Sequence, residues 1–120
     1  MMMNNPNMRI CLKKKRINLN RAAIASIGNP SHLCFRYDEQ GGVLYFTPAA
    51  PDELDVYEIP KFYWTDVEST CEISRIAFLR ALQYRLGWED GSKYYYDGKV
   101  TTINNGPALA YDLLDGTRVR

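Results

Sequence analysis

A unit of a basic strand, a short helix and a β-hairpin, formed by residues 13–46, constrains the fold of this chain more than any other stretch. Polar and apolar side chains alternate over residues 15–19, a pattern typical of a strand with one buried face. Asn20 can cap a short helix that ends at Gly28, because glycine tolerates the left-handed backbone that closes a helix. Two β-rich runs within residues 33–46 then flank an acidic, glycine-containing turn. This order predicts an α+β fold.

Residues 69–114 repeat the same order of elements. A short strand leads to Ser74, which takes the capping position of Asn20, and Gly87 ends the second helix. Leucines spaced three and four residues apart give this longer helix an apolar stripe. The strand that follows either bends at residues 97–98 or turns back there as a tight hairpin. Since one such unit cannot bury its apolar face alone, we expect the two repeats to interleave around one core.

The order of strand, capped helix ending in glycine, and hairpin with an acidic turn resembles the swapped-hairpin (SpoVT/AbrB-type) unit of AbrB-like and MraZ-like proteins. The tandem arrangement is closer to the MraZ-like form, in which two repeats of one chain interleave. The recurring Asp-x-x-x-Arg signature of MraZ is absent from both helical stretches. The resemblance implies two repeats in one small swapped-hairpin β-barrel with two short helices. It also implies a small, non-catalytic, DNA-binding transcriptional regulator.

We expect one compact domain with a connector between its two repeats. Prolines end the first hairpin because they cannot donate to a β-ladder. Residues 56–59 are expected to form an edge strand that Pro60 ends. The predicted boundaries are a disordered tail at 1–8, a first repeat at 9–47, an acidic and aromatic connector at 48–68, a second repeat at 69–114 and a tail at 115–120.

Charge is segregated along the chain, although the formal net charge is only +1. Residues 1–36 contain seven basic residues and no acidic one, whereas residues 37–72 contain nine acidic residues and one lysine. Such asymmetry indicates either a footprint for a polyanion or two surfaces that pair with each other.

Catalytic and metal sites have little support in the sequence. His32 is the single histidine, and we expect it in an exposed turn with no nucleophile or carboxylate beside it. The three cysteines lack metal-binding spacing, and Cys11 and Cys34 lie in apolar strand contexts that favour buried thiols. We therefore expect no enzymatic activity, no cofactor and no metal. With no long apolar run and no hydrophobic leader, the chain is expected to be cytoplasmic.

The basic stretch that opens the first unit is the main candidate site. In AbrB-like proteins the matching segment faces DNA, so the resemblance implies duplex DNA as the partner. Lysines there would neutralise phosphates, while Arg16 and Arg21 can donate bidentate hydrogen bonds to base edges. Alternatively, the lysines only discourage edge-to-edge strand pairing. The predicted DNA-binding residues are Lys13, Lys14, Lys15, Arg16 and Arg21, assisted by Arg75 and Arg80 from the second helix.

The matching segment of the second repeat, residues 66–72, is acidic and would repel phosphate. Either a homodimer or higher oligomer presents two basic halves, or the domain binds a protein as a phage-type or mobile-element-type inhibitor or adaptor. Aromatic side chains beside an acidic connector can anchor such a partner. In another interpretation, Phe62 and Trp64 only close the end of the barrel. The predicted partner-binding residues are Asp52, Glu53, Asp55, Phe62 and Trp64.

Overall fold

The computed structural model of the chain describes residues 5–119. One set of strands comprises β1 (Asn7–Cys11), β2 (Arg16–Leu19), β6 (Cys71–Ile73), β7 (Lys93–Asp97) and β10 (Thr117–Val119). A second set comprises β3 (His32–Asp38), β4 (Val43–Pro48), β5 (Tyr57–Glu58), β8 (Lys99–Ile103) and β9 (Gly106–Asp112). The helices are α1 (Arg21–Ser26), α2 (Lys61–Thr65) and α3 (Ile76–Leu86).

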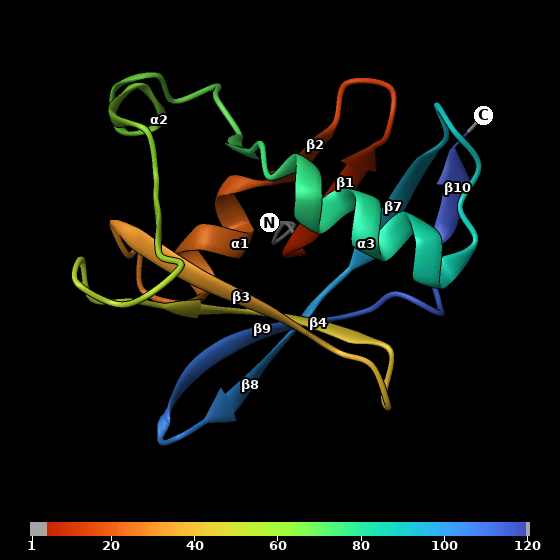
Figure 1. Ribbon diagram of the computed structural model, residues 1–120. Helices are drawn as coiled ribbons and strands as arrows, with labels where there is room; N and C mark the ends of the chain where they lie inside the picture. The colour runs from red at the N-terminus through yellow and green to blue at the C-terminus, as the bar shows by residue number, and fades with distance from the viewer. Residues whose placement is uncertain (1–4, 120) are drawn as a thin grey trace.

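The strands form two five-stranded antiparallel sheets, so the predicted α+β class is confirmed. Sheet 1 has the order β10–β7–β1–β2–β6, and sheet 2 has the order β5–β3–β4–β9–β8. In Figure 1 the labelled strands of sheet 1 lie above those of sheet 2, and α3 crosses in front of them. Among residues 5–119, no helix is long and apolar enough to cross a membrane.

One hydrophobic core fills the space between the two sheets. On the inner face of sheet 1, Ile17 pairs with Ile10 on one side and Ile73 on the other, and all three are fully buried. On the inner face of sheet 2, the fully buried Phe46 pairs with the equally buried Leu109. Because side chains alternate along a strand, each sheet turns one apolar face inward and one more polar face outward.

Both predicted helices of the repeats are present, but only one has the predicted cap. Asn20 caps α1 as expected, because its side-chain oxygen accepts a hydrogen bond from the Ala23 amide at 2.9 Å. Gly87 ends α3 with a φ of 67°, also as expected. The predicted cap at Ser74 is wrong, because Arg75 precedes the first turn of α3 and its side chain makes no capping hydrogen bond.

The connector and both tails differ from their predicted form. The connector contains α2, which was not predicted, as well as the expected edge strand, β5, at the margin of sheet 2. Residues 7–8, predicted to lie in a disordered tail, and residues 117–119, predicted to lie in a C-terminal tail, belong to strands of sheet 1 because β1 and β10 both pair with β7. Tail residues 1–4 and 120 lie outside the described residues.

Residues 97–98, for which the sequence allowed either a bend or a tight hairpin, form a bend. β7 lies in sheet 1 and β8 in sheet 2, and they do not pair with each other, which rules out the hairpin. A Cβ atom on Gly98 would lie 2.6 Å from the ring of Tyr111, so this corner requires glycine. The bent strand therefore passes from one sheet to the other.

Tyr111 provides a prediction about stability, because its buried hydroxyl finds no hydrogen-bond partner among the described residues. Since such a hydroxyl costs about 1–3 kcal/mol, Tyr111→Phe is expected to raise the free energy of unfolding by about 1 kcal/mol at neutral pH. Tyr96→Phe is the matched control, because the Tyr96 hydroxyl donates to the Leu113 carbonyl at 3.2 Å. This control should lose about 1 kcal/mol in urea denaturation. Equal effects of the two substitutions would contradict the assignment.

The same substitution tests the response to alkaline pH. Burial raises the pKa of Tyr111 above the ordinary value for tyrosine. The phenol ionises near pH 10 in the unfolded chain, so below that pH its ionisation does not reduce the free energy of unfolding. As the pH rises further, the unfolded state loses the proton first and the folded state is destabilised. We therefore expect Tyr111→Phe to unfold at a higher pH than the unsubstituted chain in a titration followed by circular dichroism.

Candidate nucleic-acid interface

Three adjacent lysines, Lys13, Lys14 and Lys15, form the turn between β1 and β2, and all three side chains are exposed. Cys11 and Arg16 are the last cross-strand pair before this basic turn. Lys15 has a φ of 56°, a backbone conformation that residues other than glycine and asparagine rarely adopt. The hairpin thus holds three ammonium groups together at one end of sheet 1, with no acidic residue in the turn.

Cations from neighbouring strands continue this charge along the outer face of sheet 1. Arg9 pairs with Asn18 on one side and Tyr95 on the other, and its guanidinium lies 5.9 Å from the centroid of the Tyr95 ring. Two residues further along β1, Arg16 and Lys93 flank the strand from its two sides. Directly paired residues share a face, so these cations lie together. Arg9 and Lys93 were not predicted as site residues, because only the strand register brings them beside Arg16.

Glu72 on β6 reduces the positive charge at the edge of this face. Its carboxylate lies 3.4 Å from the Arg16 guanidinium, and the two side chains are 38% and 43% exposed. Ion pairs this exposed contribute about 0–1 kcal/mol, so Arg16 can exchange Glu72 for another anion at little cost. The acidic segment of the second repeat therefore touches the predicted site directly.

Arg21, predicted to read bases, is engaged inside the molecule. Its guanidinium donates hydrogen bonds to the carbonyls of Tyr63 and Asp66, and to that of Val67 at 2.7 Å. It also lies 4.2 Å from the centroid of the Tyr63 ring. These carbonyls belong to α2 and the residues just after it, where backbone acceptors lack partners within the helix. Arg21 therefore joins α1 to α2 and does not extend the basic turn.

The two arginines predicted to assist from the second helix lie in different environments. Arg75 donates to the Val56 carbonyl at 3.2 Å and lies 5.3 Å from the centroid of the Tyr57 ring, so it ties α3 to the connector. Arg80 is exposed on α3 and lines a hollow of about 250 Å³ together with Lys15 of the basic turn. The fold thus brings Arg80, but not Arg75, to the basic turn.

The residues predicted to bind a protein partner lie on two separate elements. Asp52, Glu53 and Asp55 are exposed in the loop between β4 and β5, and Glu53 accepts a hydrogen bond from the Cys34 thiol at 3.3 Å. On α2, Phe62 and Trp64 remain 52% and 40% exposed. The interpretation in which they close the barrel is wrong, because the buried ring on this helix belongs to the residue between them, Tyr63.

His32 is less exposed than predicted, and it has polar neighbours. Its side chain is 15% exposed at the start of β3, with Nδ1 2.7 Å from the Ser31 hydroxyl and Nε2 3.8 Å from the Glu58 carboxylate. The hollow beside the basic turn is not lined by any of these three side chains. Among residues 5–119, no group of three or more histidine, cysteine or acidic side chains is arranged to hold a metal ion.

The buried cysteine is not one of the two that were predicted to be buried. Cys71 is fully buried, and burial raises its pKa to about 12. Cys11 and Cys34, predicted to be buried, are both half-buried on the outer faces of the two sheets. Burial first, and then the Glu53 carboxylate, raises the pKa of Cys34, which disfavours the thiolate needed for nucleophilic chemistry.

Comparisons with known proteins add no information about the site. No protein-family model, no curated protein and no solved structure matches this chain. The basic turn, the outer face of sheet 1 and Arg80 together form the cationic surface of the molecule.

Proposed function

We propose that this protein is a non-catalytic DNA-binding regulator of the AbrB/MraZ type that contacts duplex DNA with its cationic surface. The observation that carries this proposal is the basic turn, in which three exposed lysines project from the β1–β2 hairpin beside further cations. Because duplex DNA carries a dense row of phosphates, such a surface gains affinity by releasing condensed counterions. Arg9, Arg16 and Lys93 extend the contact along sheet 1.

Strand pairing supports the interleaved tandem repeat within this proposal. β2 of the first repeat pairs antiparallel with β6 of the second, and β4 pairs antiparallel with β9. Elements in corresponding positions of the two repeats thus meet as neighbours, which a two-fold relation between the repeats requires. The strand that bends at Gly98 joins the sheets on one side, as in a partly closed barrel. We accordingly propose a first repeat that extends from β1 to β4 and a second repeat at 69–114 within one cytoplasmic regulator.

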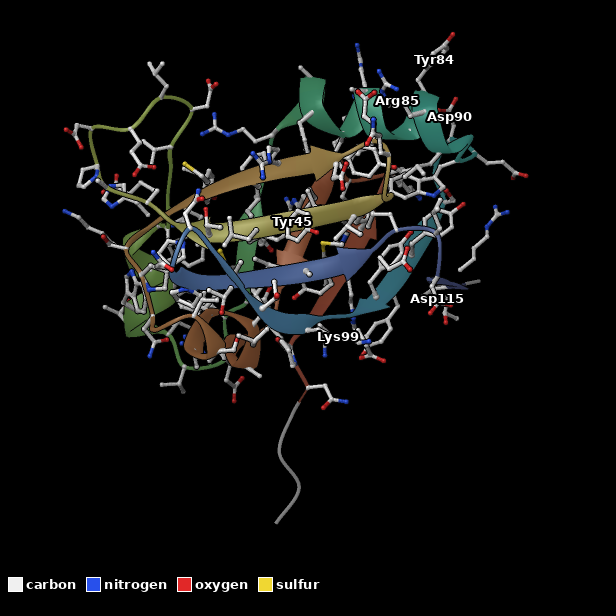
Figure 2. All side chains as sticks on the ribbon, turned by 90° about the horizontal axis from the view of Figure 1, so that it is seen from below. Tyr45, Tyr84, Arg85, Asp90, Lys99 and Asp115 are labelled. Carbon is white, nitrogen blue, oxygen red and sulfur yellow. The ribbon has the colours of Figure 1, made fainter. Side chains whose placement is uncertain are left out.

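The decisive experiment is titration of random duplex DNA at about 50 and 200 mM salt. A chain with Lys13→Ala, Lys14→Ala and Lys15→Ala is expected to bind at least about tenfold more weakly at the lower salt. Its plot of log affinity against log salt should be flatter by about 2–3 units, since each phosphate contact contributes about 0.9. Lys99→Ala is the matched control, because Lys99 lies on the outer face of sheet 2 (Figure 2) and should leave both quantities unchanged.

Lys15→Gly separates loss of charge from loss of folding. Glycine adopts the φ of 56° without steric cost, so this change should keep or raise the free energy of unfolding while it weakens DNA binding. If the unsubstituted chain does not bind DNA at the lower salt, the proposal is wrong. Binding that all lysine substitutions leave unchanged would also exclude the basic turn.

The exposure of Phe62 and Trp64 favours a second candidate, a protein-interaction module. Large aromatic side chains that remain exposed on a short helix are typical anchors of protein interfaces. The acidic loop with Asp52, Glu53 and Asp55 would then favour a basic partner. The two candidates differ because this one requires Trp64→Ala to abolish association and the lysine substitutions to have no effect.

A further inference from the structure

The outward face of α3 is exposed and has no partner among the described residues. Leu79 and Leu82 bury the inner side of the helix. On the opposite side, Ile76, Arg80 and Tyr84 follow one another at four-residue spacing, and Tyr84 is 90% exposed. Figure 2 shows Tyr84 projecting from α3 away from both sheets. The outward face is completed by two small exposed side chains, Ala77 and Ala81.

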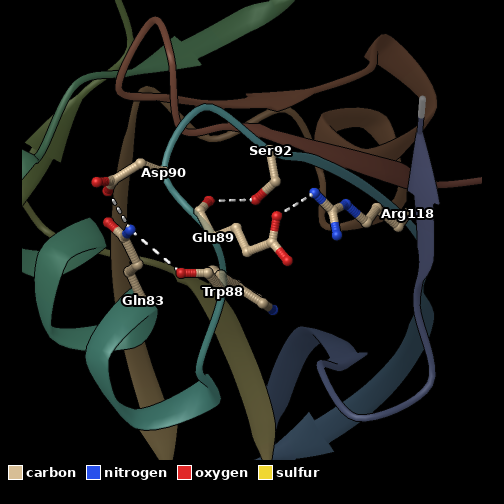
Figure 3. A network of polar contacts seen from close by, with 6 residues as sticks. All are labelled: Gln83, Trp88, Glu89, Asp90, Ser92 and Arg118. Atoms are coloured by element: carbon tan, nitrogen blue, oxygen red, sulfur yellow. Dashed lines mark hydrogen bonds and ion pairs between the residues drawn. The ribbon is translucent and has the colours of Figure 1, made fainter.

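The charges on and around this face suit an anionic partner. α3 contains no acidic residue. Two carboxylates beside the helix are paired with cations, since Glu39 lies 2.7 Å from Arg85 and Glu89 lies 3.0 Å from Arg118. Asp55 lines a separate hollow together with Ile76 and Ala77. The Asp90 carboxylate accepts a hydrogen bond at 2.6 Å from Gln83, whose amide also donates to the Trp88 carbonyl at 3.2 Å (Figure 3).

The basic turn continues this face on one side. Lys15 and Arg80 line the same hollow, whose apolar wall includes Leu12 and Leu79. These two cations come from segments more than sixty residues apart in the sequence, and only the packing of α3 against the first hairpin brings them together. The turn and the helix therefore place two cations at one edge, where the Asp90 carboxylate lines the same hollow.

We propose that α3 enters the major groove of duplex DNA with this outward face, while the basic turn holds the phosphates along the groove. Eleven residues make a helix about 16 Å long, and the groove, about 12 Å wide, admits one α-helix. Ala77 and Ala81 permit close approach of the helix axis. Arg80, in the middle of the face, donates two hydrogen bonds to the N7 and O6 of a guanine.

This inference rests on the proposed function and deepens it. It assigns base reading to Arg80, whereas the sequence analysis assigned it to Arg16 and Arg21. In this arrangement the phosphate contacts of the basic turn supply affinity and α3 supplies the choice of sequence.

The test begins with selection of bound sequences from a library of random duplexes by the unsubstituted chain. Arg80→Gln is expected to bind the selected duplex roughly ten- to a hundredfold more weakly, with a much smaller loss on random duplex. Methylation of guanine N7 in the selected duplex should weaken the unsubstituted chain similarly and leave Arg80→Gln unaffected. Arg36→Gln, on the outer face of sheet 2, is the matched control and should bind as the unsubstituted chain does.

The outcomes distinguish failure of this inference from failure of the proposed function. If Arg80→Gln selects the same guanine, the role of Arg80 is overturned and DNA binding is left intact. The same conclusion follows if methylation weakens binding by the unsubstituted chain and by Arg80→Gln equally. Salt-dependent binding without any selected sequence overturns base reading by α3 in the same way. Absence of binding to any duplex overturns the proposed function and this inference together.

Discussion

Phe46→Ala is expected to lower the free energy of unfolding by about 3–5 kcal/mol, the largest effect of any single substitution considered for this chain. Phe46 is fully buried between the two sheets. Its ring lies 5.9 Å from that of Phe35 and 5.8 Å from that of Tyr111, the latter edge-on. Alanine would remove both aromatic contacts and leave a cavity that the surrounding strands cannot close. Chains of this size have total stabilities of roughly 6–18 kcal/mol, so much of the folded state's margin would be lost.

Tyr45→Ala is the control for this substitution. Tyr45 precedes Phe46 on β4 but lies on the outer face of sheet 2, as Figure 2 shows, so its removal should cost about 1 kcal/mol or less. Urea denaturation of both variants gives the comparison, and an unchanged slope with denaturant would show that the change is one of stability. Equal losses would mean that the two sheets do not share a core at Phe46.

Local patterns in the sequence were sufficient to predict several elements of the fold. Alternation placed Ile17 and Leu19 on the buried face of β2, and both side chains are fully inaccessible to solvent. Asn20 and Gly87 mark helix ends because capping depends on neighbouring backbone groups. The bend at Gly98 was one of two local solutions, and the nearby Tyr111 ring selects it. The strand alternation and the helix ends depend on residues close in sequence or on one strand period, whereas the choice of the bend depends on Tyr111 of another strand.

The features that were missed depend on contacts between distant segments. α2 has neither an acidic first turn nor a side-chain cap, so its local signal is weak. It is held by the buried Tyr63 and by Arg21, about forty residues earlier in the chain. Likewise, Met8 was assigned to a tail, yet it is fully buried because β1 runs between β2 and β7. A window of neighbouring residues contains no information about such partners.

The candidate site shows the same division. The three lysines of the basic turn were identified from sequence, because a run of like charge needs no tertiary context. Arg9 and Lys93 join them through strand register, and Arg80 joins them through the packing of α3. The four arginines predicted to contact DNA take different roles. Backbone carbonyls elsewhere in the fold accept hydrogen bonds from Arg21 and Arg75, whereas Arg16 and Arg80 belong to the cationic surface. A charge pattern in the sequence thus predicts that a cationic surface exists better than it predicts which residues form that surface.

Arg21→Ala is expected to lower the free energy of unfolding by about 3 kcal/mol, because charge-assisted hydrogen bonds contribute about 1.5–3 kcal/mol each and are not additive. The substitution removes the donors to three carbonyls of α2 and the residues after it, and also the cation above the Tyr63 ring. Arg21→Lys should recover only part of the loss, since one ammonium cannot reproduce the planar fork of a guanidinium. Arg75→Ala, which loses one hydrogen bond to Val56, should cost about 1 kcal/mol.

DNA binding by the same variants separates a structural Arg21 from a base-reading one. Measured where both chains are fully folded, Arg21→Ala should bind random duplex within about threefold of the unsubstituted chain, because its guanidinium faces α2 and not the cationic surface. The salt slope should also be unchanged, in contrast to that of the triple lysine variant. A large loss of affinity with an unchanged free energy of unfolding would contradict this assignment and return Arg21 to the DNA interface. A loss of stability without a loss of affinity would establish that α1 and α2 depend on each other through this one side chain.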